Sequence, residues 1–161
     1  MGPATAERVR RVLAEMDVEH EVIAVDPALA DTADFSAAYG YPLDRSANTI
    51  VVASRRGPER HAACVLLAIH RLDVNGVVKR ELGTSKASFA DPESTRRLTG
   101  MEIGGVTPLA LPDDVPVWVD AAVMEHDWVI LGGGDRASKI KVAPTVLTAL
   151  PRARVVERLA G

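Results

Sequence analysis

A glycine-rich segment in the second half of the chain, Gly104-Gly105-Val106-Thr107-Pro108, has the composition of a stiff loop with accessible backbone amides. Adjacent glycines permit backbone angles that other residues avoid and let a bound molecule approach the main chain, while Pro108 fixes φ at the end of the segment. Fixed N–H groups suit an oxyanion or a phosphate, because the donors are oriented before the charge develops. Local sequence alone favours an ordinary turn for this segment.

A second glycine cluster, Gly132-Gly133-Gly134, follows an apolar stretch and continues as Asp135-Arg136-Ala137. This matches the Gly-x-Gly-x-x-Ala fingerprint of dinucleotide-binding folds, which requires a helix directly after the glycines. Here the following residues, Ser138 to Val142, have the pattern of a strand. The sequence therefore argues against a dinucleotide site.

Other common catalytic groups give no pattern. The four histidines share no metal-ligand spacing, and no Gly-x-Ser-x-Gly nucleophile motif is present. His61 and Cys64 are three residues apart on a predicted strand, so their side chains point to opposite faces. Cys64 lies in an apolar run, as a buried and unreactive thiol would. We predict no metal and no cofactor.

Composition predicts one globular domain spanning residues 1–161, with an aliphatic core, since only 4% of the residues are aromatic and 47% are hydrophobic. No apolar stretch approaches the roughly 18 residues of a membrane span, and residues 1–11 lack the apolar region of a signal peptide. We expect a cytoplasmic protein that binds no membrane. The net charge of −3 argues against a broad DNA-binding face. A protein that touches only the 3′ end of an RNA needs no basic excess.

Hydrophobic periodicity and turn residues predict alternating helices and strands. The expected helices are Ala4 to Met16, Asp31 or Thr32 to Tyr39, Leu72 to Leu82, Asp91 to Leu98 and Pro144 to Leu150. The expected strands are His20 to Val25, Asn48 to Ser54, His61 to Ile69, Lys86 to Phe89, Val115 to Val119, Trp128 to Leu131, Ser138 to Val142 and Ala153 to Val156. This order predicts an α/β fold of the α+β type: a mixed, largely antiparallel, barrel-like sheet surrounded by helices.

Short motifs along the chain resemble, in the same order, those of the YbaK/EbsC family, which is related to the editing domain inserted in prolyl-tRNA synthetases. The resemblance runs from about residue 5 to the C-terminus. It rests on Ala47 to Val52, Leu72-Asp73, Glu81 to Ala87, Ala90 to Pro92, Leu98 to Gly100, Gly104 to Pro108, Val115 to Asp120 and Gly132 to Arg136. The barrel-like fold predicted above is also the one that this resemblance implies.

The resemblance implies a trans-acting deacylase that hydrolyses the ester of a mischarged tRNA, with Cys-tRNA(Pro) as the first candidate substrate. Such an editing step is needed because a binding pocket discriminates one methylene by only about 1–3 kcal/mol. The intermediate of this reaction is tetrahedral and negatively charged. It would be stabilised by backbone amides of the loop formed by Gly104, Gly105, Val106, Thr107 and Pro108. The expected partners are the 3′ end of an aminoacyl-tRNA and, as a further expectation, an aminoacyl-tRNA synthetase.

Substrate-binding roles follow from the same resemblance. Asn48 and Thr49 would orient the terminal adenosine, Lys86 and Arg136 would contact phosphates, and Gly132, Gly133 and Gly134 would shape the amino-acid pocket. Lys86 fits a solvated lysine equally well, and Asp120 is either a turn cap or a pocket residue. Asn48 departs from the family, which usually has a lysine at this position, and an amide supplies no charge for a phosphate or an oxyanion.

Two other functions remain open on the sequence. The chain could be a binding module for an aminoacylated 3′ end, a nucleotide or a synthetase, without turnover because of Asn48. It could also be a metabolic enzyme that cleaves a small ester or thioester, in which case free aminoacyl esters would be hydrolysed without tRNA.

Overall fold

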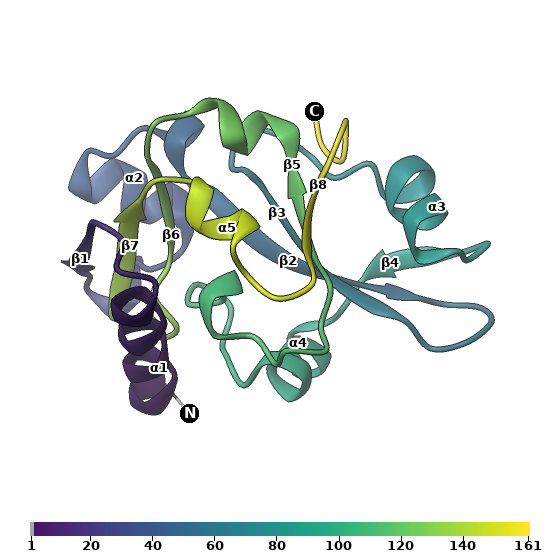
Figure 1. Cartoon of the computed structure of the whole chain (residues 1–161), viewed down its shortest axis with the longest axis horizontal. Coiled ribbons are helices and arrows are strands. Elements are labelled where there is room, and N and C mark those ends of the chain that lie inside the picture. The colour runs from purple at the N-terminus through teal and green to yellow at the C-terminus, as the bar shows by residue number, and fades with distance from the viewer. Residues whose placement is uncertain (1) are drawn as a thin grey trace.

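The computed structural model describes residues 2–161 and contains two sheets with helices packed around them (Figure 1). The smaller sheet has the order β1 (His20–Ala24), β7 (Ser138–Val142), β6 (Val129–Gly132), all antiparallel. The larger has the order β4 (Ala87–Phe89), β2 (Ala47–Ser54), β3 (His61–Leu67), β5 (Val117–Asp120), β8 (Ala153–Val156). Its β3–β5 and β5–β8 pairs are parallel and the others antiparallel. The mixed, largely antiparallel α/β fold predicted from the sequence is thus confirmed.

The barrel-like closure that we expected is wrong. An isolated bridge between Ser46, just before β2, and Ile130 of β6 joins the two sheets, and it does not continue into a ladder. The strands β4 and β8 remain at the two edges of the larger sheet. Because β2 separates from β6 after this bridge, space is left between the sheets, and this space becomes important below.

The helices are α1 (Gly2–Glu15), α2 (Thr32–Tyr39), α3 (Lys79–Leu82), α4 (Pro92–Thr99) and α5 (Thr145–Thr148). The helix α4 agrees with its sequence signals: Asp91 accepts a hydrogen bond from the Ser94 N–H at 2.7 Å, and Gly100 ends the helix with φ of 75°. No helix within residues 2–161 has the length and apolar character that crossing a membrane requires.

The predicted helix from Leu72 to Leu82 is instead a wider turn, Val74–Val78, that leads into α3. The Asp73 carboxylate accepts from the N–H groups of Gly76 and Val77. A Cβ at Gly76 would lie 2.4 Å from an Asp73 oxygen, so the capping carboxylate and the glycine require each other. This explains the glycine that interrupts the helical pattern.

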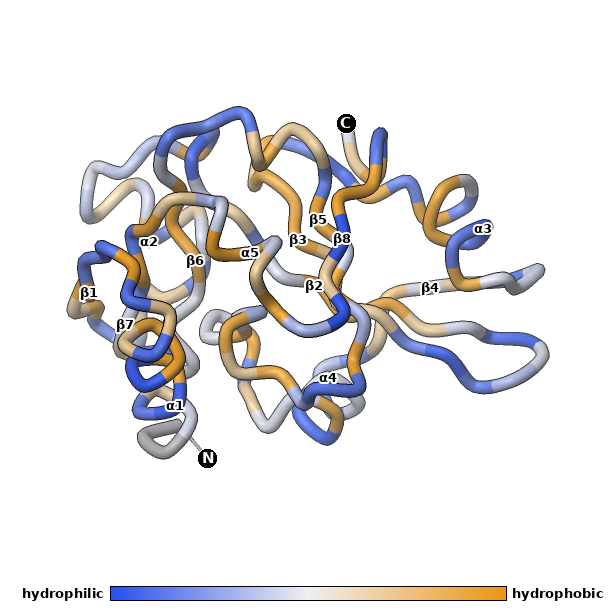
Figure 2. Tube along the Cα trace, viewed as in Figure 1, coloured by the Kyte–Doolittle hydropathy of each residue, from blue (hydrophilic) through white to orange (hydrophobic). Residues whose placement is uncertain are grey.

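The core is aliphatic, as the composition predicted. Its largest cluster joins Val9 and Leu13 of α1, both fully buried, to the inner faces of both sheets. Figure 2 shows hydrophobic strands in the interior and a hydrophilic hairpin between β2 and β3 at the periphery. A tightly packed core of this kind holds the two sheets in fixed positions, so the space between them keeps its shape.

Candidate functional site

A cavity of about 340 Å³ lies along the edge of β2. The strand β4 pairs with β2 only from Val52 to Ser54, and the Ala90 N–H extends the contact to the Val51 carbonyl. Beyond that point the β2 residues Asn48, Thr49 and Ile50 face the cavity instead of a strand. The opposite walls come from β6, β7, the start of α2 and the loop at residues 103–106.

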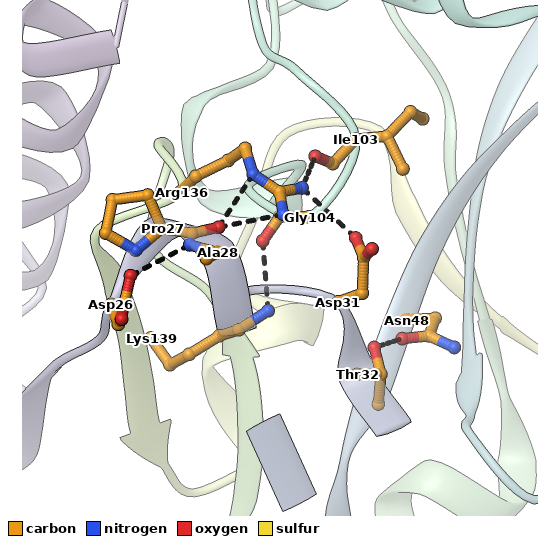
Figure 3. Close-up of polar contacts among 10 residues, drawn as sticks. All are labelled: Asp26, Pro27, Ala28, Asp31, Thr32, Asn48, Ile103, Gly104, Arg136 and Lys139. Atoms are coloured by element: carbon orange, nitrogen blue, oxygen red, sulfur yellow. Dashed lines mark hydrogen bonds and ion pairs between the residues drawn. The ribbon is translucent and has the colours of Figure 1, made fainter. Parts of the chain in front are cut away.

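Two cationic side chains hold this loop by its carbonyl groups (Figure 3). Arg136 donates to the Ile103 carbonyl at 2.7 Å and to the Asp31 carboxylate at 3.1 Å, and it is further held by the Pro27 carbonyl. Lys139 of β7 donates from Nζ to the Gly104 carbonyl at 3.0 Å. The loop is therefore fixed from one side by two hydrogen-bonded charges.

The amides of the loop divide into two groups. The Gly105 N–H donates to the Glu102 carbonyl at 2.9 Å, so it is used within the turn. Among the described contacts, the N–H groups of Gly104 and Val106 have no acceptor in the protein, and both residues line the cavity. Gly104 has φ of 93°, which favours glycine at this position. These two amides are the available donors for a negatively charged oxygen.

Lys139 is the residue of the site that the sequence did not single out. Its side chain lines the cavity with only 6% of its surface exposed, and Nζ lies 5.6 Å from the centre of the Phe35 ring. The pKa of Lys139 is lowered from 10.5 to about 8: burial is the main cause, the Arg136 charge also lowers it, and the Asp31 carboxylate opposes both. A buried ammonium is poorly screened by water, so it attracts negative charge on a bound molecule strongly.

Two buried hydroxyl groups on the cavity wall also lack partners. Within the described residues, Ser46 Oγ and Thr49 Oγ1 make no hydrogen bond, although both atoms are buried. Buried polar groups without a partner cost free energy, so both hydroxyls destabilise the protein where they stand. Nearby, Asn48 Oδ1 accepts from the Thr32 hydroxyl at 2.6 Å, which leaves the amide NH2 of Asn48 as a donor.

The structure brings together some of the predicted site residues at this cavity: Asn48, Thr49, Gly104, Val106 and Gly132 all line it. The other three glycines, Gly105 of the loop and Gly133 and Gly134 after β6, do not line the cavity. Gly134 donates its N–H to the Gly105 carbonyl at 2.9 Å and so supports the loop. Arg136 acts on the loop as described above. Thr107 is fully buried, and its hydroxyl accepts from the Leu109 N–H.

Three predicted site residues lie elsewhere. Pro108 borders a separate cavity against α1. Lys86 begins the turn before β4, where its carbonyl accepts from the Arg55 N–H, and it does not line the cavity at β2. Asp120 is 2% exposed; it accepts from the Ala160 N–H at 3.3 Å and lies 4.0 Å from His70. Lys139, rather than Lys86, is thus the lysine of this cavity.

The site holds no cluster suited to a metal. Across residues 2–161, no group of three or more His, Cys, Asp or Glu side chains is arranged to bind an ion. Cys64, on β3, is buried, and this burial raises the pKa of its thiol to about 12. A thiol with this pKa stays protonated at neutral pH and is a poor nucleophile.

Comparison with known proteins agrees with this architecture. The chain matches the family model "Aminoacyl-tRNA editing domain" over residues 26–150. It is 26% identical over 140 residues to the uncharacterized protein YwhH of Bacillus subtilis (strain 168), with 87% of each chain covered.

Two solved structures share the fold. One is a proposed trans-editing enzyme for prolyl tRNA synthetase, with a TM-score of 0.78, 24% identity and 95% of each chain covered. The other is the hypothetical protein APE2540, with a TM-score of 0.84, 23% identity and coverage of 96% of this chain and 99% of that one. The cavity, its glycine loop and the match over residues 26–150 lead to one conclusion: the chain belongs to the aminoacyl-tRNA editing domain family.

Proposed function

We propose that this protein is a trans-acting aminoacyl-tRNA deacylase and that the cavity along β2 binds the aminoacylated 3′ end. The observation that carries the proposal is the shared wall of the cavity: Lys139 lines it together with Gly104 and Val106, whose N–H groups have no protein acceptor among the described contacts. Donors fixed in this way stabilise the negatively charged oxygen of a tetrahedral intermediate.

The reaction is hydrolysis of the ester between the amino acid and the ribose. Water adds to the carbonyl carbon, and the C=O electron pair moves onto the oxygen that faces Gly104, Val106 and Lys139. The bond from carbon to the ribose oxygen then breaks, the proton from water ends on that ribose oxygen, and a free amino acid and a tRNA hydroxyl result. The Asn48 amide, whose NH2 remains a donor on the cavity wall, supplies a hydrogen bond for the ribose.

Cys-tRNA(Pro) is the proposed substrate. The cavity is small, about 340 Å³, and Gly132 on its wall lets the loop backbone pack closely against β6, since a Cβ there would lie 2.2 Å from the Val106 carbonyl oxygen. A small amino acid fits such a space, and with cysteine the substrate's own thiol is an alternative attacking group to water. Because no side chain of the cavity is an obvious general base, an attacking group carried by the substrate is consistent with the site.

The test is deacylation of tRNAs charged with cysteine, alanine, serine and their cognate amino acids, at enzyme concentrations far below those of the substrate. We expect catalytic release of cysteine from Cys-tRNA(Pro) and retention of correctly charged tRNAs. Release of a different amino acid would identify that aminoacyl-tRNA as the substrate in place of Cys-tRNA(Pro). Absence of release across the panel would contradict the deacylase proposal.

A binding module is the second candidate, and Asn48 is the observation that favours it, since an amide brings no charge to the β2 wall. Our proposal instead assigns the positive charge of the cavity to Lys139. We therefore expect Asn48→Lys to leave the deacylation rate unchanged or lower, because it removes the acceptor for Thr32 and adds a second ammonium to the cavity. A rise of tenfold or more in kcat would show that Asn48 limits turnover and would support the binding module.

A further inference from the structure

An exposed aromatic side chain, Phe89, directly precedes Ala90, which lines the cavity. Phe89 ends β4 and is 53% exposed, whereas the chain's other phenylalanine, Phe35, is 1% exposed. Phe89 pairs in register with Val52, and the next residue, Ala90, lines the cavity. Because residues two positions apart on a strand share a face, Phe89 lies diagonally across from Ile50, which also lines the cavity. Phe89 thus adjoins, on both β2 and β4, residues that line the cavity.

Two arginines lie on segments that adjoin Phe89. Arg55 donates from Nη2 to the Phe89 carbonyl at 2.9 Å and from Nε to the Ser88 hydroxyl, which fixes its guanidinium along the outer edge of β4. Arg97 belongs to α4, which begins just after Phe89. The Ser94 hydrogen bond is the main cause of the lowered pKa of Asp91, and the charges of Arg55 and Arg97 lower it further. Both cations are therefore close to the segment that follows the ring.

We propose that Phe89, Arg55 and Arg97, here called the Phe89 rim, bind the unpaired nucleotides that precede the aminoacylated adenosine of the tRNA. This inference rests on the proposed function, which places the adenosine in the adjoining cavity. Unpaired bases stack on exposed aromatic rings, and arginines pair with the phosphates between them. An exposed ring with arginines on the adjoining segments suits a single strand, whose bases and phosphates alternate along its length.

The edge of β4 argues against a second copy of the chain as the occupant. Another strand could add to β4 only by bonding to its outward-facing backbone groups. Arg55 already occupies the Phe89 carbonyl on that edge. A side chain that blocks strand addition while leaving the aromatic ring exposed favours a partner that uses the ring, as a nucleic acid base does.

The experiment compares two substrates of the wild type and of Phe89→Ala: cysteinyl-tRNA(Pro), and 2′(3′)-O-cysteinyl-adenosine, which lacks the preceding nucleotides. Loss of one stacked base should lower kcat/KM for the tRNA roughly tenfold to a hundredfold, and much more than for the adenosine ester. Phe89→Tyr should restore the tRNA activity, because its ring can stack. The matched control is Val155→Ala on β8, the opposite edge of the same sheet, which is 41% exposed and should leave both rates unchanged.

The arginines are tested through salt. For a single strand, each lost phosphate contact reduces the slope of log affinity against log salt concentration by about 0.7. We expect this reduction for Arg55→Gln with tRNA and no change of slope with cysteinyl-adenosine. The backbone N–H of Arg55 and its bond to the Lys86 carbonyl remain in the variant, so β4 keeps its place.

Other outcomes would contradict the proposed role of the Phe89 rim. Equal losses on both substrates, or no loss on tRNA, would show that Phe89 does not meet the preceding nucleotides. A wild-type dimer that Phe89→Ala converts to a monomer would assign the ring to self-association. If the wild type hydrolyses neither substrate, the proposed function fails; binding of a single-stranded RNA ending in CCA, measured for wild type and Phe89→Ala, then decides on the rim alone.

Discussion

Replacement of Lys139 by methionine is expected to reduce kcat for deacylation by a factor of about 10² to 10³, the effect of removing one stabilising group from an oxyanion. Among the described residues that line the cavity with Gly104 and Val106, Lys139 carries the only positive charge. Its side chain is buried, so this charge acts strongly on a bound molecule. Methionine has a similar length and no charge. It leaves no unpaired charge behind, so the fold should be retained.

Two further variants separate the charge of Lys139 from its hydrogen bond to the Gly104 carbonyl. Glutamine can still donate to that carbonyl but carries no charge, whereas arginine keeps the charge. If Lys139 stabilises the oxyanion directly, Lys139→Gln should be as slow as the methionine variant and Lys139→Arg should retain part of the rate. A glutamine variant with the wild-type kcat would instead make Lys139 a positioning residue for the loop.

The pH dependence gives an independent readout. The pKa of Lys139 is lowered to about 8, so the ammonium is present below that pH and is lost as the pH rises through it. The charged groups that face it are Arg136 and Asp31. The enzymatic rate, after subtraction of the uncatalysed hydrolysis, should therefore fall around pH 8 in the wild type. No such fall is expected in Lys139→Met, and a rate that rises through pH 8 would indicate a neutral Lys139 acting as a base.

Stability should change with the opposite sign. Between about pH 8 and 10.5 the unfolded chain keeps the proton on Lys139 that the folded protein has lost. Because the unfolded state then binds more protons, the free energy of unfolding contributed by this group rises with pH across that window. Denaturant unfolding of the wild type and of Lys139→Met at pH 7.5 and 10 would measure it; the pH-dependent difference should be absent from the variant.

The sequence located the loop but not its charge, for a physical reason. Glycines at 104 and 105 indicate an unusual backbone wherever they lie, so the loop could be inferred from local composition. Strand alternation puts Ile140 and Val142 on one face of β7 and Lys139 on the other. Ile140 and Val142 are indeed buried in the main core, but α2 and its Phe35 cover the other face of the strand at Lys139. Periodicity reports which residues share a face and not what covers that face.

The two-sheet arrangement was missed for a related reason. Strand patterns within β2 and β6 predict two strands, but the single bridge between Ser46 and Ile130 depends on tertiary packing that no local pattern contains. The unpaired edge of β2 that results is what forms the cavity. The prediction that Gly105 offers its amide to a ligand fell short in the same way, because the Glu102 carbonyl that accepts this N–H is fixed only by the folded turn.

Alanine at Gly132 is expected to have the second large effect, on the shape of the loop. A Cβ there would lie 2.2 Å from the Val106 carbonyl oxygen and 3.1 Å from the Gly105 carbonyl oxygen. Both neighbours are backbone atoms, so no flexible side chain can move aside. The loop must shift away from β6, and displacing a fixed donor by about 1 Å can cost roughly 10²-fold in rate. Overpacking at a buried position should also lower the free energy of unfolding by roughly 1–3 kcal/mol.

Gly57→Ala is the control for the general cost of losing a glycine. Gly57 has φ of 72° in the β2–β3 turn and would meet nothing within 4 Å, so alanine there introduces backbone strain without contact to the loop. Its kcat should equal that of the wild type, while its stability falls by about 1–2 kcal/mol. The two variants then have similar losses of stability, but only Gly132→Ala shifts the loop that carries the Gly104 and Val106 amides. If Gly132→Ala keeps the wild-type kcat at a temperature where both variants are folded, the position of the Gly104 and Val106 amides does not control the reaction, and the oxyanion assignment fails with it.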